Sequence, residues 1–317
     1  MKKLQGDQFQ NYERVEIHGK SIWIPYPVNI PQGPFVGRAD IMEKALAAWT
    51  SLDGLLPLNF RLYGPPGVGK NAIVYELARI LKKDLYIING HEELGPEDIA
   101  CSATMTSKNT IEYVASPLFA AMLRGGIFFF DEIGKAPTSA LDPLASVLDE
   151  RRTLSSVLAG IHLKANDDFL FCAALNQDEE EGIGLPGFID ERTRPAIYVG
   201  YPKATELEAI LKAQLPMLGK QWIEVFILEF KDKELSPRTA INLLSYAFRL
   251  YKNSNETTKQ VKKSEIKRYL EIAYKDIVTR EEENKKDSAK SLLDEKKKRG
   301  EENHGLLSNL LKRDGVH

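Results

Sequence analysis

The sequence predicts an α/β fold, in which a parallel sheet carries helices on both faces and is followed by a small helical domain. Three observations lead to this prediction. Short, uniformly apolar segments alternate with helical segments between residues 58 and 199, as is typical of strands buried on both faces. A glycine-rich loop joins the first apolar segment to a helix. After Pro202 the apolar spacing is helical only.

The elements follow in order along the chain. Alternating apolar and polar residues over 15–24 predict a β hairpin, and the spacing over 39–49 predicts a helix. The predicted strands of the sheet are 58–63, 84–89, 127–130, 169–175 and 196–199, and the predicted helices between them are 72–81, 116–123 and 138–150. Helices over 207–215, 222–230 and 238–251 make up the helical domain.

These elements group into four expected parts. Residues 1–34 form an N-terminal β extension, and residues 35–202 form the α/β domain. Residues 203–252 form a helical lid domain, with 279 as its alternative end. Residues 280–317 form a charged tail in which Lys, Glu, Asn and Asp dominate, which predicts a solvated helix or a flexible segment.

Composition excludes several classes of protein. The net charge is −2, from 43 basic and 45 acidic side chains, which disfavours a general nucleic-acid binder. Cys101 and Cys172 lie far apart and fit two reduced thiols. No apolar segment approaches the roughly 20 residues that span a bilayer, and the N-terminus lacks a signal core. We therefore expect a cytoplasmic protein without a membrane partner.

The glycine-rich loop has the composition of a phosphate-binding loop. It consists of Gly64, Pro65, Pro66, Gly67, Val68, Gly69 and Lys70, and the helix continues with Asn71 and Ala72. Glycines let backbone N–H groups curl around phosphates, and the end of the following helix adds partial positive charge. Lys70 would neutralise the β and γ phosphates of a nucleotide. The loop therefore predicts ATP as the ligand.

Two adjacent carboxylates follow the apolar strand 127–130, where ligands bind in open α/β sheets. Asp131 is expected to hold Mg²⁺ through water. Glu132 is expected to orient and activate the attacking water. An apolar strand followed by Asp-Glu is common by itself, and its position about sixty residues after the loop is what favours this interpretation.

Three further polar positions are candidates with open alternatives. Asn176 ends an apolar strand and would position the lytic water or serve as a turn residue. The charged cluster 190–194 would supply an arginine to a neighbour's γ-phosphate or form a solvated patch. Arg238 follows Ser236 and Pro237, which suit a helix start, and a cation there opposes the helix dipole. Its position therefore favours contact with a phosphate.

Taken together, these segments resemble the MoxR-like branch of AAA+ ATPases, including its dynein-related and CbbQ/NorQ-type members. The resemblance runs from about Phe35 to about Tyr251. Its carriers are FVGR at 35–38, GPPGVGK at 64–70, GHEELGPEDI at 90–99, SPLFAAMLRGGIFFFDEIGKAP at 116–137, LDERR at 148–152, LPGFIDERTRPAIYVGYP at 185–202 and SPRTAINLL at 236–244.

The resemblance implies roles that spacing alone does not give. Gly37 would lie near adenine, Asn176 would be sensor 1 and Arg238 sensor 2. Arg192 would be the arginine finger, with Arg194 as a second candidate. Residues 91–116 resemble an insert that reaches toward a ring pore, and 152–164 resemble the hairpin before sensor 1.

Members of this branch bind ATP and Mg²⁺, form homo-hexameric rings and remodel a protein client. A partner with a von Willebrand factor A domain often accompanies them. The resemblance therefore implies an ATP-hydrolysing remodelling factor.

Three positions depart from the family pattern. Asn71 replaces the usual Ser or Thr, so it would hold Mg²⁺ together with Asp131 or leave that place to water. Gly134 replaces an Asn, and Gln177 replaces a Pro. Two alternatives to a ring ATPase remain open. One is a nucleotide-dependent scaffold that hydrolyses poorly, and the other is a DNA-directed accessory motor.

Overall fold

The computed structural model describes residues 9–52, 54–105, 110–176, 185–254 and 261–279. The chain divides into two compact units. The first unit comprises Met1–Gln214 with Glu234–Arg238, and the second comprises Leu215–Lys233 with Thr239–His317. The expected tail over 280–317 and the departure at Gln177 lie outside the described residues.

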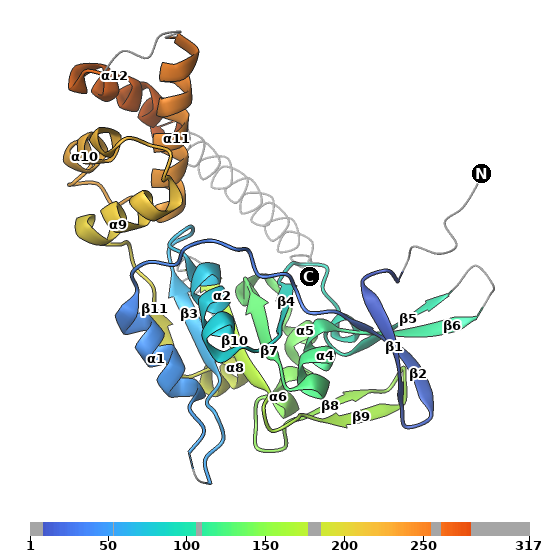
Figure 1. The fold of residues 1–317 in the computed structure, drawn as a ribbon. Coiled ribbons are helices and arrows are strands. Elements are labelled where there is room, and N and C mark those ends of the chain that lie inside the picture. Colours follow the sequence, from blue (N-terminus) through green and yellow to red (C-terminus); the bar gives the residue numbers. More distant parts are fainter. Residues whose placement is uncertain (1–8, 53, 106–109, 177–184, 255–260, 280–317) are drawn as a thin grey trace, which may run out of the picture. The chain divides into compact units, whose positions relative to one another are not determined.

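The first unit is built on a five-stranded parallel sheet with the order β11-β3-β10-β7-β4 (Figure 1). Its strands are β3 (Phe60–Gly64), β4 (Leu85–Asn89), β7 (Ile127–Asp131), β10 (Leu170–Asn176) and β11 (Ala196–Tyr198). All five predicted strands are present, and β3 begins two residues later than expected. Because every pair is parallel, the carboxyl ends of the strands meet at one edge of the sheet.

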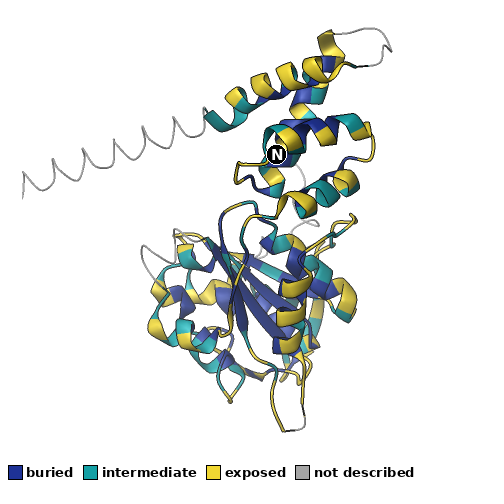
Figure 2. Cartoon of the chain, turned by 90° about the vertical axis from the view of Figure 1, so that its left-hand side faces the viewer, coloured by how far each residue is buried: buried dark blue, intermediate teal, exposed yellow. Residues whose placement is uncertain are grey.

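Both faces of the sheet are covered, as the predicted fold class requires. Ile127 and Phe129 belong to one hydrophobic cluster, with α1 (Ala39–Trp49) and α2 (Lys70–Leu81). Phe128 and Phe130 belong to the other, with α4 (Pro117–Arg124), α5 (Thr138–Leu141), α6 (Leu144–Val147) and α8 (Gly187–Arg192). Successive strand residues point to opposite faces, which explains why the strand sequence is apolar throughout. The strands are accordingly the most uniformly buried part of Figure 2.

The single helix predicted over 138–150 is wrong. The structure has two short helices instead, α5 (Thr138–Leu141) and α6 (Leu144–Val147). Pro143 stands between them, and a proline has no backbone N–H to continue a helix. Ala140, Leu141 and Leu144 are buried in the core, so the segment is helical in two parts but is not the continuous helix that was predicted.

A second sheet of four strands packs on the same core, with the order β1-β2-β6-β5. The predicted N-terminal hairpin supplies β1 (Tyr12–Ile17) and β2 (Lys20–Pro25). The segment interpreted as an insert supplies α3 (Pro96–Ile99), β5 (Cys101–Met105) and β6 (Ile111–Ala115). β2 pairs with β6 in parallel, so the N-terminal extension is part of the first unit.

The first unit also contains another hairpin and two further helices. The hairpin expected over 152–164 is present as β8 (Thr153–Ser156) and β9 (Ile161–Lys164). The short helix α8 (Gly187–Arg192) precedes β11, and α9 (Ala204–Gln214) follows it.

The second unit contains α10 (Lys220–Glu229), most of α11 (Pro237–Ser254) and α12 (Lys263–Tyr274), and α12 continues as a π-helix over Lys275–Thr279. Aromatic side chains join these helices. The ring of Trp222 contacts Phe248 and Tyr251, with centroids 5.3 and 5.6 Å apart. Within the described ranges, no helix combines the length and apolar character needed to cross a bilayer.

Candidate functional site

Most sequence-predicted residues of the first unit meet at the carboxyl edge of the sheet. Gly64 ends β3 and Lys70 begins α2, so the glycine-rich loop spans the gap between strand and helix. Asn176 ends β10 and lies opposite Gly64 in register. Asp131 ends β7 on the other side of β10. The parallel register therefore brings together motifs that are more than 100 residues apart in sequence.

Tight packing explains two glycines of the loop. Gly64 has φ of +148°, and a Cβ there would lie 2.1 Å from the carbonyl oxygen of Val199. Gly67 has φ of +77°, and a Cβ there would lie 2.7 Å from the Ser236 hydroxyl. A side chain would therefore clash at either position, and positive φ adds a backbone cost. The remaining loop residues divide by exposure, with Val68 buried, and Pro66 and the following Ala72 exposed.

Lys70 is held under the loop by neutral oxygen atoms. Its side chain is 8% exposed, and Nζ donates to the carbonyl oxygens of Gly64 at 2.7 Å and Pro65 at 3.1 Å. It also donates to Oδ1 of Asn176 at 3.0 Å. These acceptors orient the ammonium group without neutralising it. The arrangement suits a cation that would meet phosphate oxygens, and it places Asn176 beside the Lys70 ammonium group.

Asn71 and Asp131 contact each other directly. Nδ2 of Asn71 donates to Oδ2 of Asp131 at 2.6 Å, and Oδ1 of Asp131 accepts from the backbone N–H of Glu132 at 3.0 Å. Burial raises the pKa of Asp131 above its usual value, and the hydrogen bond from Asn71 opposes that rise.

The pair fits Mg²⁺ only in part. Asp131 supplies hard carboxylate oxygens, which Mg²⁺ prefers. The Asn71 side chain, in contrast, presents an N–H group to that carboxylate. Asp131 is therefore the residue that would hold the ion, whereas the Asn71 amide does not turn an oxygen toward the same place.

Glu132 is fixed in a tight turn after β7. Its φ is +52°, and its carbonyl oxygen lies so close to Gly90 that a Cβ there would be only 2.2 Å away. Its carboxylate is 40% exposed and pairs with Nζ of Lys135 at 2.7 Å. Glu132 can therefore reach water, and Lys135 holds its orientation. Lys135 was not among the predicted site residues, although its i+3 spacing from Glu132 is a readable signal.

The segment before α1 is tied to the loop. Gly37 has φ of +83°, and a Cβ there would lie 2.3 Å from Oε1 of Glu206. The backbone N–H of Arg38 donates to that oxygen at 2.7 Å, and Nη2 of Arg38 donates to the carbonyl of Val68 at 3.0 Å. Glu206, on α9, thus positions Gly37 and Arg38 beside the loop. No motif in the sequence marked it.

The start of α11 also lies against the loop. The backbone N–H of Arg238 donates to the carbonyl of Gly67 at 3.4 Å, and Ser236 is buried at 6% exposure. The Arg238 side chain is exposed. This segment, Glu234–Arg238, belongs to the first unit. The start of α11 therefore lies beside the loop, and the phosphate contact of Arg238 stays a prediction.

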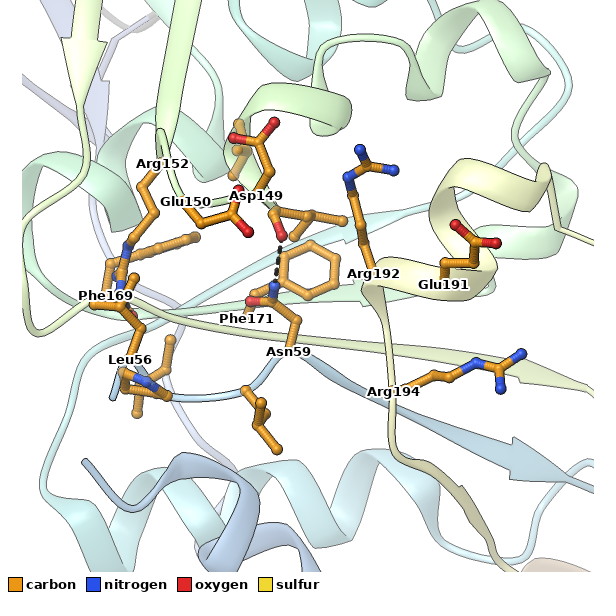
Figure 3. A pocket seen from close by; sticks show the side chains of 15 residues that line it. Leu56, Asn59, Asp149, Glu150, Arg152, Phe169, Phe171, Glu191, Arg192 and Arg194 are labelled. Carbon is orange, nitrogen blue, oxygen red and sulfur yellow. Dashed lines mark hydrogen bonds between the residues drawn. The ribbon is translucent and has the colours of Figure 1, made fainter. Parts of the chain in front are cut away.

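Arg192 and Arg194 lie at the opposite, amino-terminal edge of the sheet. They line a pocket of about 260 Å³ with Asn59, Asp149 and Arg152 (Figure 3). Figure 3 shows their side chains extending in different directions from the end of α8. The Arg192 guanidinium donates to the carbonyl of Phe188 at 3.1 Å. The structure therefore does not bring these arginines to the loop of their own chain.

Ion pairing distinguishes the two arginines. Arg194 pairs with Asp190 at 2.6 Å, and this partner lowers the pKa of the Asp190 carboxyl. In the described part of the chain, Arg192 makes no ion pair with a carboxylate. Arg192 is thus the better placed of the two to bind an external anion.

A buried arginine organises this edge. Arg61 of β3 is 5% exposed and donates to the carbonyl oxygens of Asp190 at 3.0 Å and Thr193 at 3.3 Å. It also pairs with Oδ1 of Asp190 at 2.5 Å. Arg61 was not among the predicted site residues, and its signal in the sequence is a charge inside an otherwise apolar strand. It fixes the segment that carries both arginines.

Comparison with known proteins bears on this geometry. Residues 59–186 match the family described as the AAA domain of the dynein-related subfamily. The matched range includes the loop, both carboxylates and Asn176, so the similarity extends over the whole carboxyl-edge cluster. The narrower assignment to the MoxR-like branch stays a prediction.

Curated relatives share part of this region. The uncharacterized protein YojN of Bacillus subtilis (strain 168) is 28% identical over 177 residues, which cover 55% of this chain and 58% of that protein. An uncharacterized protein of Staphylococcus aureus (strain USA300) is 28% identical over 173 residues, which cover 53% of this chain and 65% of that protein. The match thus spans less than two thirds of either relative.

Solved structures share the fold of a larger part of the chain. A point mutant of Thermotoga maritima RuvB has a TM-score of 0.56 at 18% identity, with 76% of this chain and 73% of that chain covered. NtrX from Brucella abortus, in complex with ADP, has a TM-score of 0.54 at 13% identity, with 74% and 55% covered. These similarities confirm the AAA+ P-loop fold that the sequence predicted.

Proposed function

We propose that this chain is an AAA+ ATPase that works as a ring of identical subunits and uses ATP to remodel or activate a protein client. One observation carries the proposal. The AAA domain gathers Lys70, Asp131, Glu132 and Asn176 at one edge of its sheet and holds Arg192 at the other. Each chain would therefore carry half of two different hydrolysis sites.

The carboxyl-edge half would bind ATP and prepare water for attack. The loop N–H groups and Lys70 would hold the phosphates, and Asn176 would stand beside them through its bond to Lys70. The exposed carboxylate of Glu132 would accept a proton from the attacking water. Asp131 would hold Mg²⁺, which would supply positive charge to the phosphates when bound.

The amino-edge half would complete a neighbour's site. β3 separates the two edges by five residues, which at about 3.3 Å per residue is roughly 15 Å. An arginine at this edge is useful for hydrolysis only if a second chain places its nucleotide there. Repeating one such head-to-tail contact generates a ring when the rotation closes.

Apolar side chains beside the arginines support a subunit contact. Leu52, Leu55, Leu56 and Leu58 are each between 50% and 64% exposed. Leu56 and Leu58 line the same pocket as Arg192 and Arg194. Exposed apolar groups gathered in this way are typical of an interaction surface.

Two assays test the ATPase. Lys70→Ala removes the cation of the loop and should abolish ATP binding, whereas Glu132→Gln should bind ATP and not turn it over. Wild-type turnover in Glu132→Gln would show that Glu132 is not the base. A wild type that binds ATP and shows no turnover in any condition would favour the alternative, a nucleotide-dependent scaffold. The unusual Asn71 is the residue that favours this alternative.

Mixing experiments test the ring. Arg192→Ala should bind ATP and hydrolyse little, and mixing it with Lys70→Ala should restore part of the activity at mixed interfaces. Light scattering after gel filtration should show a closed oligomer with ATP, for which the MoxR resemblance suggests six subunits. A strictly monomeric protein with full ATPase activity would refute the ring.

A pull-down with a variant that binds ATP and does not hydrolyse it tests for a protein client. Glu132→Gln should retain a protein client in pull-downs with ATP, with Lys70→Ala as the matched control. The family resemblance suggests a partner bearing a von Willebrand factor A domain. The near-neutral net charge of the chain disfavours a DNA-directed motor. Tight, salt-sensitive binding of DNA in a filter assay would reverse that preference.

A further inference from the structure

We propose that Asn71 binds nucleotide phosphate directly and links it to Asp131, so that the nucleotide binds with little dependence on Mg²⁺. The inference rests on the proposed function, because it concerns the same nucleotide site. It assigns the Asn71 amide the task of linking the phosphate to Asp131, which Mg²⁺ would otherwise perform.

The orientation of the Asn71 side chain follows from its partner. An ionised carboxylate only accepts hydrogen bonds, so the amide must turn its NH₂ group, and not its oxygen, toward Asp131. The 2.6 Å separation between Nδ2 and Oδ2 is that of a short, charge-assisted bond. In the described part of the chain this is the hydrogen bond that fixes the side chain.

The second N–H of the same nitrogen is suited to a phosphate oxygen. Asn71 immediately follows Lys70 in the first turn of α2, where backbone N–H groups converge on the loop. An NH₂ group can donate to two acceptors at once. In this position the two acceptors would be the Asp131 carboxylate and a phosphate oxygen of the nucleotide. The amide would thus separate two anions that would otherwise repel each other.

The same contact makes Asp131 a poorer magnesium site. Both of its oxygens already accept a hydrogen bond, from Asn71 and from the backbone of Glu132. A cation that approaches Asp131 must compete with the partly positive N–H groups that point at it. A Ser or Thr hydroxyl would offer an oxygen to the ion, whereas an amide nitrogen has no acceptor capacity. Asn71 therefore lowers the affinity of the site for the metal ion and supplies a hydrogen-bond donor to the phosphate.

Calorimetric titration of ADP tests the inference, with saturating Mg²⁺ in one series and excess EDTA in the other. For the wild type, we expect the two dissociation constants to agree within about threefold, which is less than 1 kcal/mol. Asn71→Thr restores a hydroxyl and should lose roughly tenfold or more in EDTA. Asn71→Asp keeps the shape but sets two carboxylates side by side, so its binding should require Mg²⁺.

Asn166→Asp is the matched control. Asn166 is exposed, far from the loop in sequence, and its Oδ1 accepts from the backbone of Asp168 at 2.9 Å, which an aspartate can also do. Its ADP binding should match the wild type in both series. Circular dichroism melts of all variants show that each is folded before titration.

The outcomes separate the inference from the proposed function. If the wild type binds ADP with the same Mg²⁺ dependence as Asn71→Thr, the amide does not replace the ion and the inference is overturned, whereas the nucleotide site stands. If the folded wild type binds neither ADP nor ATP in either series, the proposed function fails and the inference fails with it.

Discussion

Replacing Arg61 with methionine should destabilise the first unit and impair ATP hydrolysis while leaving nucleotide binding intact. Methionine retains much of the length of the side chain but removes every donor. The lost partners are the carbonyl and carboxylate of Asp190 and the carbonyl and hydroxyl of Thr193, at 2.5 to 3.3 Å. Thr193 is completely buried, so water cannot replace the lost donors there.

The size of the effect follows from burial. Breaking a fully buried ion pair costs about 3–5 kcal/mol, and a buried acceptor left without a donor costs about 1–3 kcal/mol. Asp190 is 32% exposed and keeps Arg194 as a partner, which reduces the first cost. We therefore expect a loss of about 3 kcal/mol in the free energy of unfolding. For a domain of this size, that corresponds to a melting temperature lower by roughly 6–12 °C.

Circular dichroism melts measure the stability, and Arg194→Met is the control. Arg194 contacts the exposed side of the same aspartate, with 65% of its side chain exposed, so its loss should barely change the melting temperature. Equal melting temperatures for Arg61→Met and the wild type would show that the buried hydrogen bonds contribute no net stability.

Kinetics below the melting transition separate positioning from stability. Because Arg61 acts on the segment that carries Arg192, Arg61→Met should lower kcat and leave the dissociation constant for ADP unchanged. Arg61→Lys restores a charge and should recover part of kcat. Normal kcat in folded Arg61→Met would mean that Arg61 only stabilises the fold.

Three further predictions concern other parts of the first unit. Burial raises the pKa of Cys101 to about 11 and that of Cys172 well above its usual value. Neither thiol should therefore react with a chromogenic thiol reagent at pH 8 until the protein is unfolded, as measured by absorbance. Rapid reaction of the native protein would contradict this. Gly67→Ala places a Cβ on a residue in the left-handed conformation and against the Ser236 hydroxyl. It should lower the free energy of unfolding in a urea titration by at least about 1–2 kcal/mol and weaken ADP binding. Wild-type values for both would argue against close packing between the loop and Ser236. Glu206→Gln keeps an acceptor for the backbone of Arg38 but loses the charge, so it should weaken ADP binding less than Glu206→Ala does. Wild-type ADP binding by both variants would show that Glu206 does not position that segment.

The carboxyl-edge cluster could be predicted because each part has a local signature. Apolar strands fix where the sheet lies, and a parallel sheet fixes that their ends meet. Lys70, Asp131 and Asn176 each directly follow or end such a segment, so chain order was enough to group them. The direct bond between Asn71 and Asp131 was not predictable, because it depends on side-chain orientation across two strands.

The positioning residues could not be predicted for the same physical reason. Arg38 and Glu206 are 168 residues apart, and Arg61 and Asp190 are 129 apart. No periodicity or spacing rule links partners at that distance. The pairing of β2 with β6 is similar, since a two-residue parallel contact leaves no mark in the sequence. Only the charge of Arg61 within an otherwise apolar strand is a sequence signal that a buried partner is needed, and Arg61 was not among the predicted site residues.

The two halves of the proposed site would control different steps. If Asn71 takes over part of the role of the ion, a subunit could bind nucleotide before it meets either Mg²⁺ or a neighbour. Hydrolysis would still need the positive charge that Arg192 brings from another chain, because Lys70 is the cation fixed in the loop of its own chain. Loading would then be a property of one subunit, and turnover a property of the assembled ring. A dilution series should therefore lower the ATPase rate per subunit without changing ADP affinity, and a rate independent of dilution down to the monomer would refute this division.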